Sequence, residues 1–342
     1  MEIPKTQMRR EIEEIPEAVA RLLEQGRDAN ARTAREIARR DPRFLLSVAR
    51  GTSDHACTFL KYASELLFGL PMASVGPSVA SIYGAEIKAN GALCIAVSQS
   101  GQSPDIVELT RNARESGAFA LALTNNPVSP LAEAASATLD IHAGPELSVA
   151  ATKTFVTSIA AGLWLFAEWR QDRDLMAAVQ NLPEALEQAV RCDWSAPLDA
   201  LSEGSLFTLG RGPSWAISNE AALKFKETCQ IHAESYSSAE VLHGPVSIVG
   251  SGFPVICFAA ADKAEAAVVD VAEALAQKGA RVFATSDAVR TAGRLEHART
   301  GHWLTDPIAL IVSFYAMVEQ AAGRRGINPD TPRHLKKVTE TV

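Results

Sequence analysis

The chain has no long hydrophobic run and no excess of basic residues. Lysine and arginine number 33 against 40 aspartates and glutamates, a net charge of -7 over 342 residues, so a nucleic-acid-binding surface is not expected. Apolar runs such as Leu93 to Val97 are far shorter than the ~20 residues that span a bilayer. The first residues, Met1 to Lys5, lack the apolar core of a signal peptide. We therefore expect a cytoplasmic protein, with neither nucleic acid nor membrane among its partners.

Cysteine pairs and metal-binding motifs are also missing. The cysteines are scattered, with no CxxC or CxxH spacing, at positions 57, 94, 192, 229 and 257. Several lie in apolar stretches, as buried reduced thiols do. The seven histidines form no HxH or HExxH pattern. The sequence thus predicts no disulfide, no metal site and no cofactor.

What the chain does have is an internal duplication, at an offset of about 160 residues. Each copy begins with an apolar strand that ends in an Arg-Gly turn. Two further apolar strands follow it. The matched segments are 44–53 with 206–214, 93–97 with 254–258, and 118–124 with 281–285. Alternation of strand, turn and helix predicts an α/β fold with two tandem, doubly wound parallel sheets of the flavodoxin-like kind, covered by helices on both faces.

This duplication gives a domain layout with five parts. We expect an N-terminal helical segment at 1–40, a first α/β domain at 41–170, a helical linker at 171–199, a second α/β domain at 200–325, and a C-terminal tail at 326–342. Pro16 marks a break in the first part. The tail has two prolines and few apolar residues, so it is either disordered or laid over a site.

A polar loop, Ser98 to Ser103, joins the buried strand that ends at Val97 to a helix expected near Pro104. Three hydroxyls, two amides and a glycine beside free helix N–H groups suit an anion, most simply a phosphate. The loop contains no lysine, unlike the nucleotide-binding P-loop, so a phosphate monoester on a small molecule fits better than a triphosphate. The alternative is a serine-rich helix cap. The second copy has Ala259 to Asp262 at this place and lacks such a loop.

A second turn, Thr52-Ser53, opens the helix that follows the first strand. Its plain role is helix capping, worth about 1 kcal/mol, which is compatible with phosphate binding because both use the same helix end. The candidate phosphate ligands are Thr52, Ser53, Ser98, Gln99, Ser100 and Ser103.

Lys224 and Glu227 lie three residues apart, on one face of a largely apolar helix. They are either a solvated salt pair or a buried pair whose carboxylate serves as a general base. His243 lies in a loop with glycine and proline, where an exposed imidazole can exchange protons near neutral pH. A structural role for this histidine is the alternative. Lys336 and Lys337 in the tail are surface charges on the plainest interpretation.

Several of these motifs together resemble a known family. The Arg50-Gly-Thr-Ser turn, Ser98-Gln-Ser-Gly101, Ala150-Ala-Thr-Lys153 and Glu240-Val-Leu-His-Gly-Pro245 are similar to those of tandem sugar isomerase (SIS) domains. The resemblance covers essentially the whole chain. It extends to the isomerase half of glucosamine-6-phosphate synthase and, most closely, to the SIS-type glucosamine-6-phosphate deaminases.

The resemblance implies roles for individual residues. It implies phosphate binding at Ser53 and the Ser98 loop, and contacts of Val149 and Ala150 with the sugar. It implies proton transfer between C1 and C2 by Glu227 with Lys224 beside it, and ring opening by His243 reaching in from a neighbouring subunit. Lys337 matches the lysine that forms a Schiff base with a ketose in the synthase. Ala151 stands where the synthase pattern has serine, which removes one contact with the sugar.

The expected activity is therefore deamination of glucosamine 6-phosphate to fructose 6-phosphate and ammonia, by a homodimer with shared sites. No cysteine follows Met1, so the chain has no N-terminal nucleophile to draw nitrogen from glutamine. The alternatives are another amino-sugar or ketose/aldose phosphate isomerase, a fructosamine-6-phosphate deglycase, and a non-catalytic sugar-phosphate sensor. Whether Lys337 forms a Schiff base or only orients the open sugar stays undecided.

Overall fold

Two five-stranded parallel sheets organise the chain. The computed structural model describes residues 5–201 and 204–337. The first sheet has the order β2-β1-β3-β4-β5, with β1 Phe44–Val48, β2 Met72–Ser74, β3 Ala92–Val97, β4 Phe119–Thr124 and β5 Ala137–Asp140. The second has the order β10-β9-β8-β6-β7, with β6 Ser205–Gly210, β7 His232–Ser237, β8 Pro254–Cys257, β9 Arg281–Ala284 and β10 Gly293–Arg294.

The two sheets repeat one topology. In each, the chain begins in an inner strand (β1 or β6), adds one strand on one side, and then crosses to build the other three outward. All strand pairs are parallel. The predicted duplication and the predicted pair of doubly wound sheets are confirmed. Each sheet therefore has a switch point, between β1 and β3 or between β6 and β8, where such folds bind their ligands.

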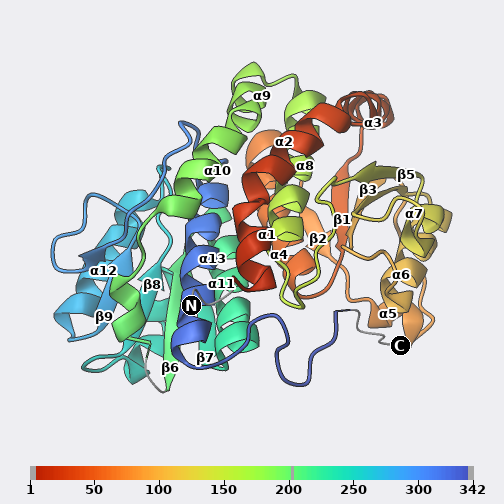
Figure 1. Cartoon of the computed structure of the whole chain (residues 1–342). Helices are drawn as coiled ribbons and strands as arrows, with labels where there is room; N and C mark the ends of the chain where they lie inside the picture. Colours follow the sequence, from red (N-terminus) through yellow and green to blue (C-terminus); the bar gives the residue numbers. More distant parts are fainter. Residues whose placement is uncertain (1–4, 202–203, 338–342) are drawn as a thin grey trace. The chain divides into compact units, whose positions relative to one another are not determined.

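Helices flank each sheet (Figure 1). Those associated with the first sheet are α2 Ile15–Gln25, α3 Arg27–Arg40, α4 Thr52–Phe68, α5 Ser78–Ser81, α6 Pro104–Glu115, α7 Pro130–Ala134, α8 Lys153–Arg170 and α9 Arg173–Gln180. Those associated with the second are α1 Gln7–Glu13, α10 Leu182–Arg191, α11 Pro213–Cys229, α12 Glu265–Gln277 and α13 Asp306–Arg324, with short 3-10 helices η1 Ala196–Asp199, η2 Glu240–Leu242 and η3 Pro245–Ile248. Helix α6 begins at Pro104, where the sequence predicts it.

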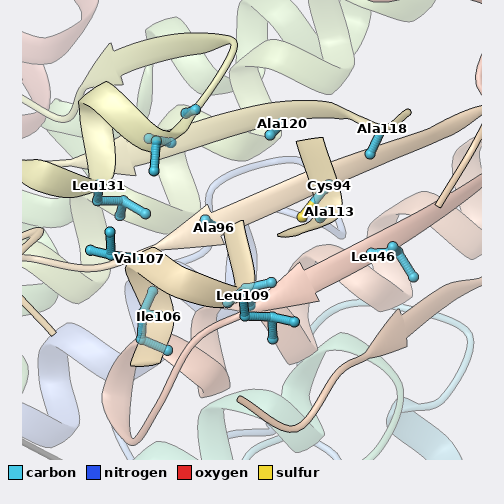
Figure 2. Packing of buried hydrophobic residues seen from close by; sticks show 14 of the residues in the cluster. Leu46, Cys94, Ala96, Ile106, Val107, Leu109, Ala113, Ala118, Ala120 and Leu131 are labelled. Atoms are coloured by element: carbon cyan, nitrogen blue, oxygen red, sulfur yellow. The ribbon is translucent and has the colours of Figure 1, made fainter. Parts of the chain in front are cut away.

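Strands β3 and β4 are apolar except for Thr124, because helices cover both of their faces. Every residue of β3 and β4 is buried. Figure 2 shows Ile106 and Leu109 of α6 in one cluster with Cys94 and Ala96 of β3. A second cluster, around Phe207, joins β6, β8 and β9 to α12.

The chain folds into two compact units that do not follow its linear order. The first-sheet unit contains Glu17–Glu146, Lys153–Gln180 and the end of the chain from Leu335. The second-sheet unit contains the start of the chain up to Pro16, Leu147–Thr152 and Asn181–His334. The N-terminal helices break between α1 and α2, next to Pro16 as expected.

In the second-sheet unit, α1 packs on α13 through charged pairs. Arg9 forms an ion pair with Glu319 at 2.6 Å. Asp330 accepts the backbone N–H groups of Gln7 and Met8 at 2.8 Å each, so its carboxylate caps the first turn of α1. Helix α1 is therefore part of the second-sheet unit.

All five cysteines are free thiols, and Cys57, Cys94, Cys229 and Cys257 are buried. Burial raises the pKa of Cys94 and of Cys257 to about 12. These thiols are uncharged at neutral pH and hence unreactive. In the part of the chain that the structure describes, no helix has the length and apolar content needed to cross a membrane.

Candidate functional site

The Ser98–Ser103 loop lies at the carboxyl end of β3 and leads into α6. The loop is held by its own hydroxyls, since Gly101 N–H donates to Ser98 Oγ and Gln102 N–H to Ser100 Oγ, both at 3.2 Å. Gly101 adopts the left-handed conformation with φ +64°. A Cβ atom there would stand 2.1 Å from Ser129 Oγ. Only glycine fits at this point, so the loop's path depends on it.

Two helix N-termini meet at this edge of the first sheet. Strands β1 and β3 are neighbours, with Val48 paired to Ala96, so the start of α4 lies beside the start of α6. Ser103 is the N-cap of α6, but its side chain does not cap the helix. Thr52 and Ser53 form the first turn of α4. The expected phosphate ligands therefore share one edge, where two helix dipoles favour an anion.

Arg50 is a further charged residue at this edge, and sequence reasoning used it only as a marker of the repeat. Its Nε donates to Asp105 Oδ2 at 2.5 Å. The Asp105 carboxylate is fully buried in the first turn of α6, whereas the Arg50 side chain is 47% exposed. The pair joins the β1–α4 turn to the loop and places a guanidinium at the anion-binding edge. The signal available in the sequence was an aspartate directly after Pro104, in the expected first turn of a helix.

Lys224 and Glu227 form the centre of a charged cluster on α11. Lys224 Nζ lies 2.5 Å from Glu227 Oε2 and 3.2 Å from Glu220 Oε1. The Lys224 side chain is 1% exposed and that of Glu220 is fully buried, so the alternative of a solvated salt pair is wrong. Tyr315 of α13 donates to Glu220 Oε1 at 3.0 Å. Sequence reasoning missed Glu220, although its i,i+4 spacing to Lys224 was visible.

Lys224 and Glu227 differ in their charge and in their exposure to solvent. Burial alone would lower the pKa of Lys224, but the two carboxylates, Glu220 and Glu227, outweigh it and raise that pKa well above its ordinary value. Lys224 therefore remains an ammonium throughout the neutral range. The Glu227 side chain is 21% exposed and is the open end of the cluster. Of the two predicted residues, Glu227 is the one that can exchange a proton with a ligand.

Among the described residues, His243 forms no side-chain hydrogen bond or ion pair with this cluster. It is exposed at the end of η2, where its N–H donates to Glu240 O at 2.9 Å. Gly244 follows with φ +132°, a conformation available to glycine. Within the described residues, the side-chain bond of Glu227 leads to Lys224 and not to His243. A single chain thus leaves this imidazole outside the cluster.

Lys337 is bound to a carboxylate that the sequence did not suggest. Its Nζ donates to Glu146 Oε2 at 2.9 Å, and the Glu146 side chain is fully buried. Val149, which is half-buried, donates its N–H to Asp330 O at 3.4 Å, and Ala150 is buried. The described part of the tail is therefore bonded to the segment that follows β5.

Within the described chain, a groove elsewhere on the first sheet contains none of the predicted site residues. This groove, of about 900 Å³, lies between α3 and the amino ends of β4 and β5, at the opposite edge of the first sheet from the Ser98 loop. In the described ranges, no three His, Cys, Asp or Glu side chains are grouped as metal ligands would be.

Two parallel five-stranded sheets in tandem, one with the Ser98–Ser103 loop at its switch point, place the chain among two-domain, doubly wound α/β proteins. Residues 40–168 and 201–321 match the SIS domain. The chain belongs to the SIS-domain family.

Individual relatives agree with this assignment. The glutamine–fructose-6-phosphate aminotransferase (isomerizing) of Aeropyrum pernix is 35% identical over an alignment of 318 positions that covers 87% of this chain and 51% of that protein. The chain spans about half the length of the curated relatives it matches. A crystal structure of a proposed phosphosugar isomerase from Silicibacter pomeroyi is 63% identical, with a TM-score of 0.93 over 95% of this chain and all of that one.

The likeness in fold reaches further than the likeness in sequence. Glucosamine-6-phosphate deaminase from Thermotoga maritima superposes with a TM-score of 0.78 over 98% of this chain and all of that one, at 17% identity. At that identity the comparison demonstrates the shared fold alone.

Proposed function

We propose that the protein is a phosphosugar isomerase of the SIS family, and specifically a glucosamine-6-phosphate deaminase. The observation that carries the proposal is the buried Glu220–Lys224–Glu227 cluster, in which one carboxylate is left partly open. A sensor needs no such partly open carboxylate beside a buried ammonium. The relatives support the substrate class, because an aminotransferase and a proposed phosphosugar isomerase both handle sugar phosphates.

In this proposal the Ser98 loop, Ser53 and Thr52 hold the phosphate at the two helix N-termini. That remote binding energy positions C1 and C2 of the sugar. Val149 and Ala150 line the sugar. His243 of a second copy moves a proton from O1 to the ring oxygen, which opens the pyranose to the aldehyde. We propose a homodimer with shared sites, as the family resemblance implies for His243.

Glu227 then transfers a proton between the two carbons. Its carboxylate takes the C2 proton, and the electrons of that C–H bond form an enolamine. Return of the proton at C1 leaves a ketimine at C2, which water hydrolyses to fructose 6-phosphate and ammonia. Lys224 holds Glu227 in place through the 2.5 Å contact, and its fixed positive charge stabilises the carboxylate and the developing enolamine oxygen.

The direct test is to incubate the protein with glucosamine 6-phosphate and to measure ammonia and fructose 6-phosphate together. Equimolar release of both is expected. Glu227→Gln should lower turnover by at least about 10²-fold, the usual worth of a general base, while substrate binding persists. Binding without turnover in the parent protein would favour a sensor. Turnover of fructosamine 6-phosphates or ketose phosphates, without ammonia from the aldose amine, would favour a deglycase or an isomerase.

The shared site has its own test. Glu227→Gln and His243→Ala chains, each inactive alone, are mixed after mild dissociation. Because a hybrid dimer contains one site with both wild-type residues, we expect about a quarter of the parent activity to return. No recovery, with hybrid dimers demonstrated by mass spectrometry, would place both residues in one chain's site.

A further inference from the structure

We infer that Glu146 is a further catalytic residue, which docks the tail lysine and exchanges a proton with it. The inference deepens the proposed function and rests on its sugar-phosphate substrate. It takes up the Schiff base with a ketose that the family resemblance implies for Lys337. The Glu146 carboxylate is the group in contact with the Lys337 Nζ atom, at 2.9 Å.

Both carboxylate oxygens of Glu146 accept hydrogen bonds from neighbouring groups. Its Oε1 accepts the backbone N–H of Thr154 at 3.0 Å, and its Oε2 accepts the Thr154 hydroxyl at 2.7 Å as well as the Lys337 ammonium. Thr154 lies in the first turn of α8, whose dipole favours a negative charge at this end. The side chain itself is fully buried. Both oxygens are therefore held in place before any substrate arrives.

The balance of charges sets the resting state of the pair. Burial would raise the pKa of Glu146, but the Lys337 charge and the hydrogen bonds from Thr154 outweigh burial and lower that pKa below its ordinary value. Lys153 Nζ donates to Pro145 O at 2.8 Å, next to Glu146 in the chain. His142 and Asp140, whose side chains lie 3.6 Å apart, precede Glu146 on the same segment. Within the second-sheet unit, Glu11 accepts the N–H of Leu147, the next residue in the chain. At neutral pH the resting pair is a carboxylate and an ammonium.

An ammonium has no lone pair, so Lys337 must lose a proton before it can form a bond to carbon. Glu146 Oε2 takes that proton. The freed Nζ lone pair attacks C2 of the open ketose, and the carbonyl electrons move to oxygen. Glu146 then returns its proton to that oxygen, which leaves as water with a second proton from Nζ. The product is a protonated imine, and the sum of the steps is ammonium plus ketone giving iminium plus water.

A purely structural role is the competing explanation, since Glu146 also caps α8. Three substitutions separate the two roles. Glu146→Gln keeps an oxygen for the Thr154 N–H and removes the proton acceptor. Glu146→Asp keeps the acceptor on a shorter arm. Thr154→Val removes one hydrogen bond from the carboxylate and leaves its charge.

The experiment is borohydride trapping with fructose 6-phosphate, with the labelled Lys337 peptide quantified by mass spectrometry between pH 6 and 9. We expect trapping in the parent to be fast and nearly independent of pH. Glu146→Gln should trap about 10²-fold more slowly at pH 7. Its rate should rise about tenfold per pH unit, because the neutral amine of an unassisted lysine increases that way below its ordinary pKa of about 10.4. Glu146→Asp should recover part of the rate, and Thr154→Val should stay within a few-fold of the parent.

Two results would overturn the inference. One is a Glu146→Gln protein that is folded by circular dichroism and traps at the parent rate with no pH dependence. The other is a parent that is not trapped at Lys337 at all. The deaminase proposal is judged separately by ammonia release, so trapping without ammonia refutes that proposal and leaves the role of Glu146 standing.

Discussion

Lys224 shows how much a single residue depends on its neighbours. Its ammonium has almost no contact with solvent and is neutralised by two carboxylates, one of which is itself fully buried. Desolvation of three charges is costly, and close contacts offset that cost only while all partners remain. Removing one partner leaves an uncompensated charge in the interior.

We predict that Lys224→Met destabilises the protein by about 3–5 kcal/mol, the usual cost of breaking a buried ion pair. The exposed lysine two residues on, Lys226, is the matched control on the same helix, and Lys226→Met should cost about 1 kcal/mol or less. Urea unfolding at pH 7 measures both. Adding Glu220→Gln to Lys224→Met should recover part of the loss, because it removes a buried negative charge that no longer has the Lys224 ammonium beside it. A further loss would contradict this account.

Among the elements, the Ser98–Ser103 loop and the start of α8 are the two whose geometry most directly affects the proposed site. The loop depends on one left-handed glycine packed against Ser129, which is itself the N-cap of α7. The start of α8 depends on the buried Glu146 carboxylate. Both elements can be tested without altering a predicted phosphate ligand.

Gly101→Ala should disturb the loop more than left-handed strain alone can explain. Gly69 has nearly the same φ, +69°, but nothing lies within 4 Å of a Cβ added there. Gly69→Ala should therefore cost only the left-handed penalty of about 1–2 kcal/mol. Gly101→Ala should cost about 1–3 kcal/mol more, because Ser129 must move in a packed region. Urea unfolding gives the difference, and glucosamine 6-phosphate titration should show weaker binding in Gly101→Ala alone. Equal costs would mean that Ser129 moves freely.

Glu146 should make the stability of the protein depend on acid pH. Its pKa in the folded state is below the ordinary value of 4.5 because Lys337 and Thr154 outweigh burial. Its stabilising contribution is therefore fully present above pH 4.5 and disappears as the pH falls through the lower, folded-state pKa. The free-energy difference between the parent and Glu146→Gln, measured by urea unfolding from pH 7 to pH 3, should shrink over that range. The exposed Glu115 is the control, and the difference for Glu115→Gln should stay constant.

At the scale of the whole molecule, each compact unit is made of segments that are not contiguous in the sequence. The helix that begins the chain, α1, belongs with α13 and the second sheet, while the helices that follow it belong with the first sheet. Ile12 of α1 is completely buried and Arg10 is exposed. A destabilising substitution in α1 should therefore lower the stability of the second-sheet unit.

Ile12→Ala should cost about 2–5 kcal/mol, as large-to-small core substitutions do, and Arg10→Ala less than about 0.5 kcal/mol. Hydrogen exchange with mass spectrometry should show the loss of protection in β6, β8 and β9, not in β1, β3 and β4. Loss of protection confined to the first sheet would contradict the assignment of α1 to the second-sheet unit.

Much of the fold was predictable because its signals are local. The apolar run before Ser98 is a buried strand, and α6 begins at Pro104, as the sequence predicts. The shared face of Lys224 and Glu227 also follows from helical spacing. The roles of His243, Lys337 and the phosphate ligands remain predictions, to be tested by the experiments above.

The partners of the charges were not predictable, because they come from distant parts of the chain. Lys337 meets Glu146 across 191 residues, and Tyr315 meets Glu220 across 95. A sequence shows that a lysine is present, but not whether a carboxylate is buried against it. Sequence by itself determined the duplicated, doubly wound α/β architecture, because hydrophobic runs and turns act over a few residues. Only the tertiary structure decided which charges are buried and paired, because burial and contact exist only once the helices have packed on their sheets.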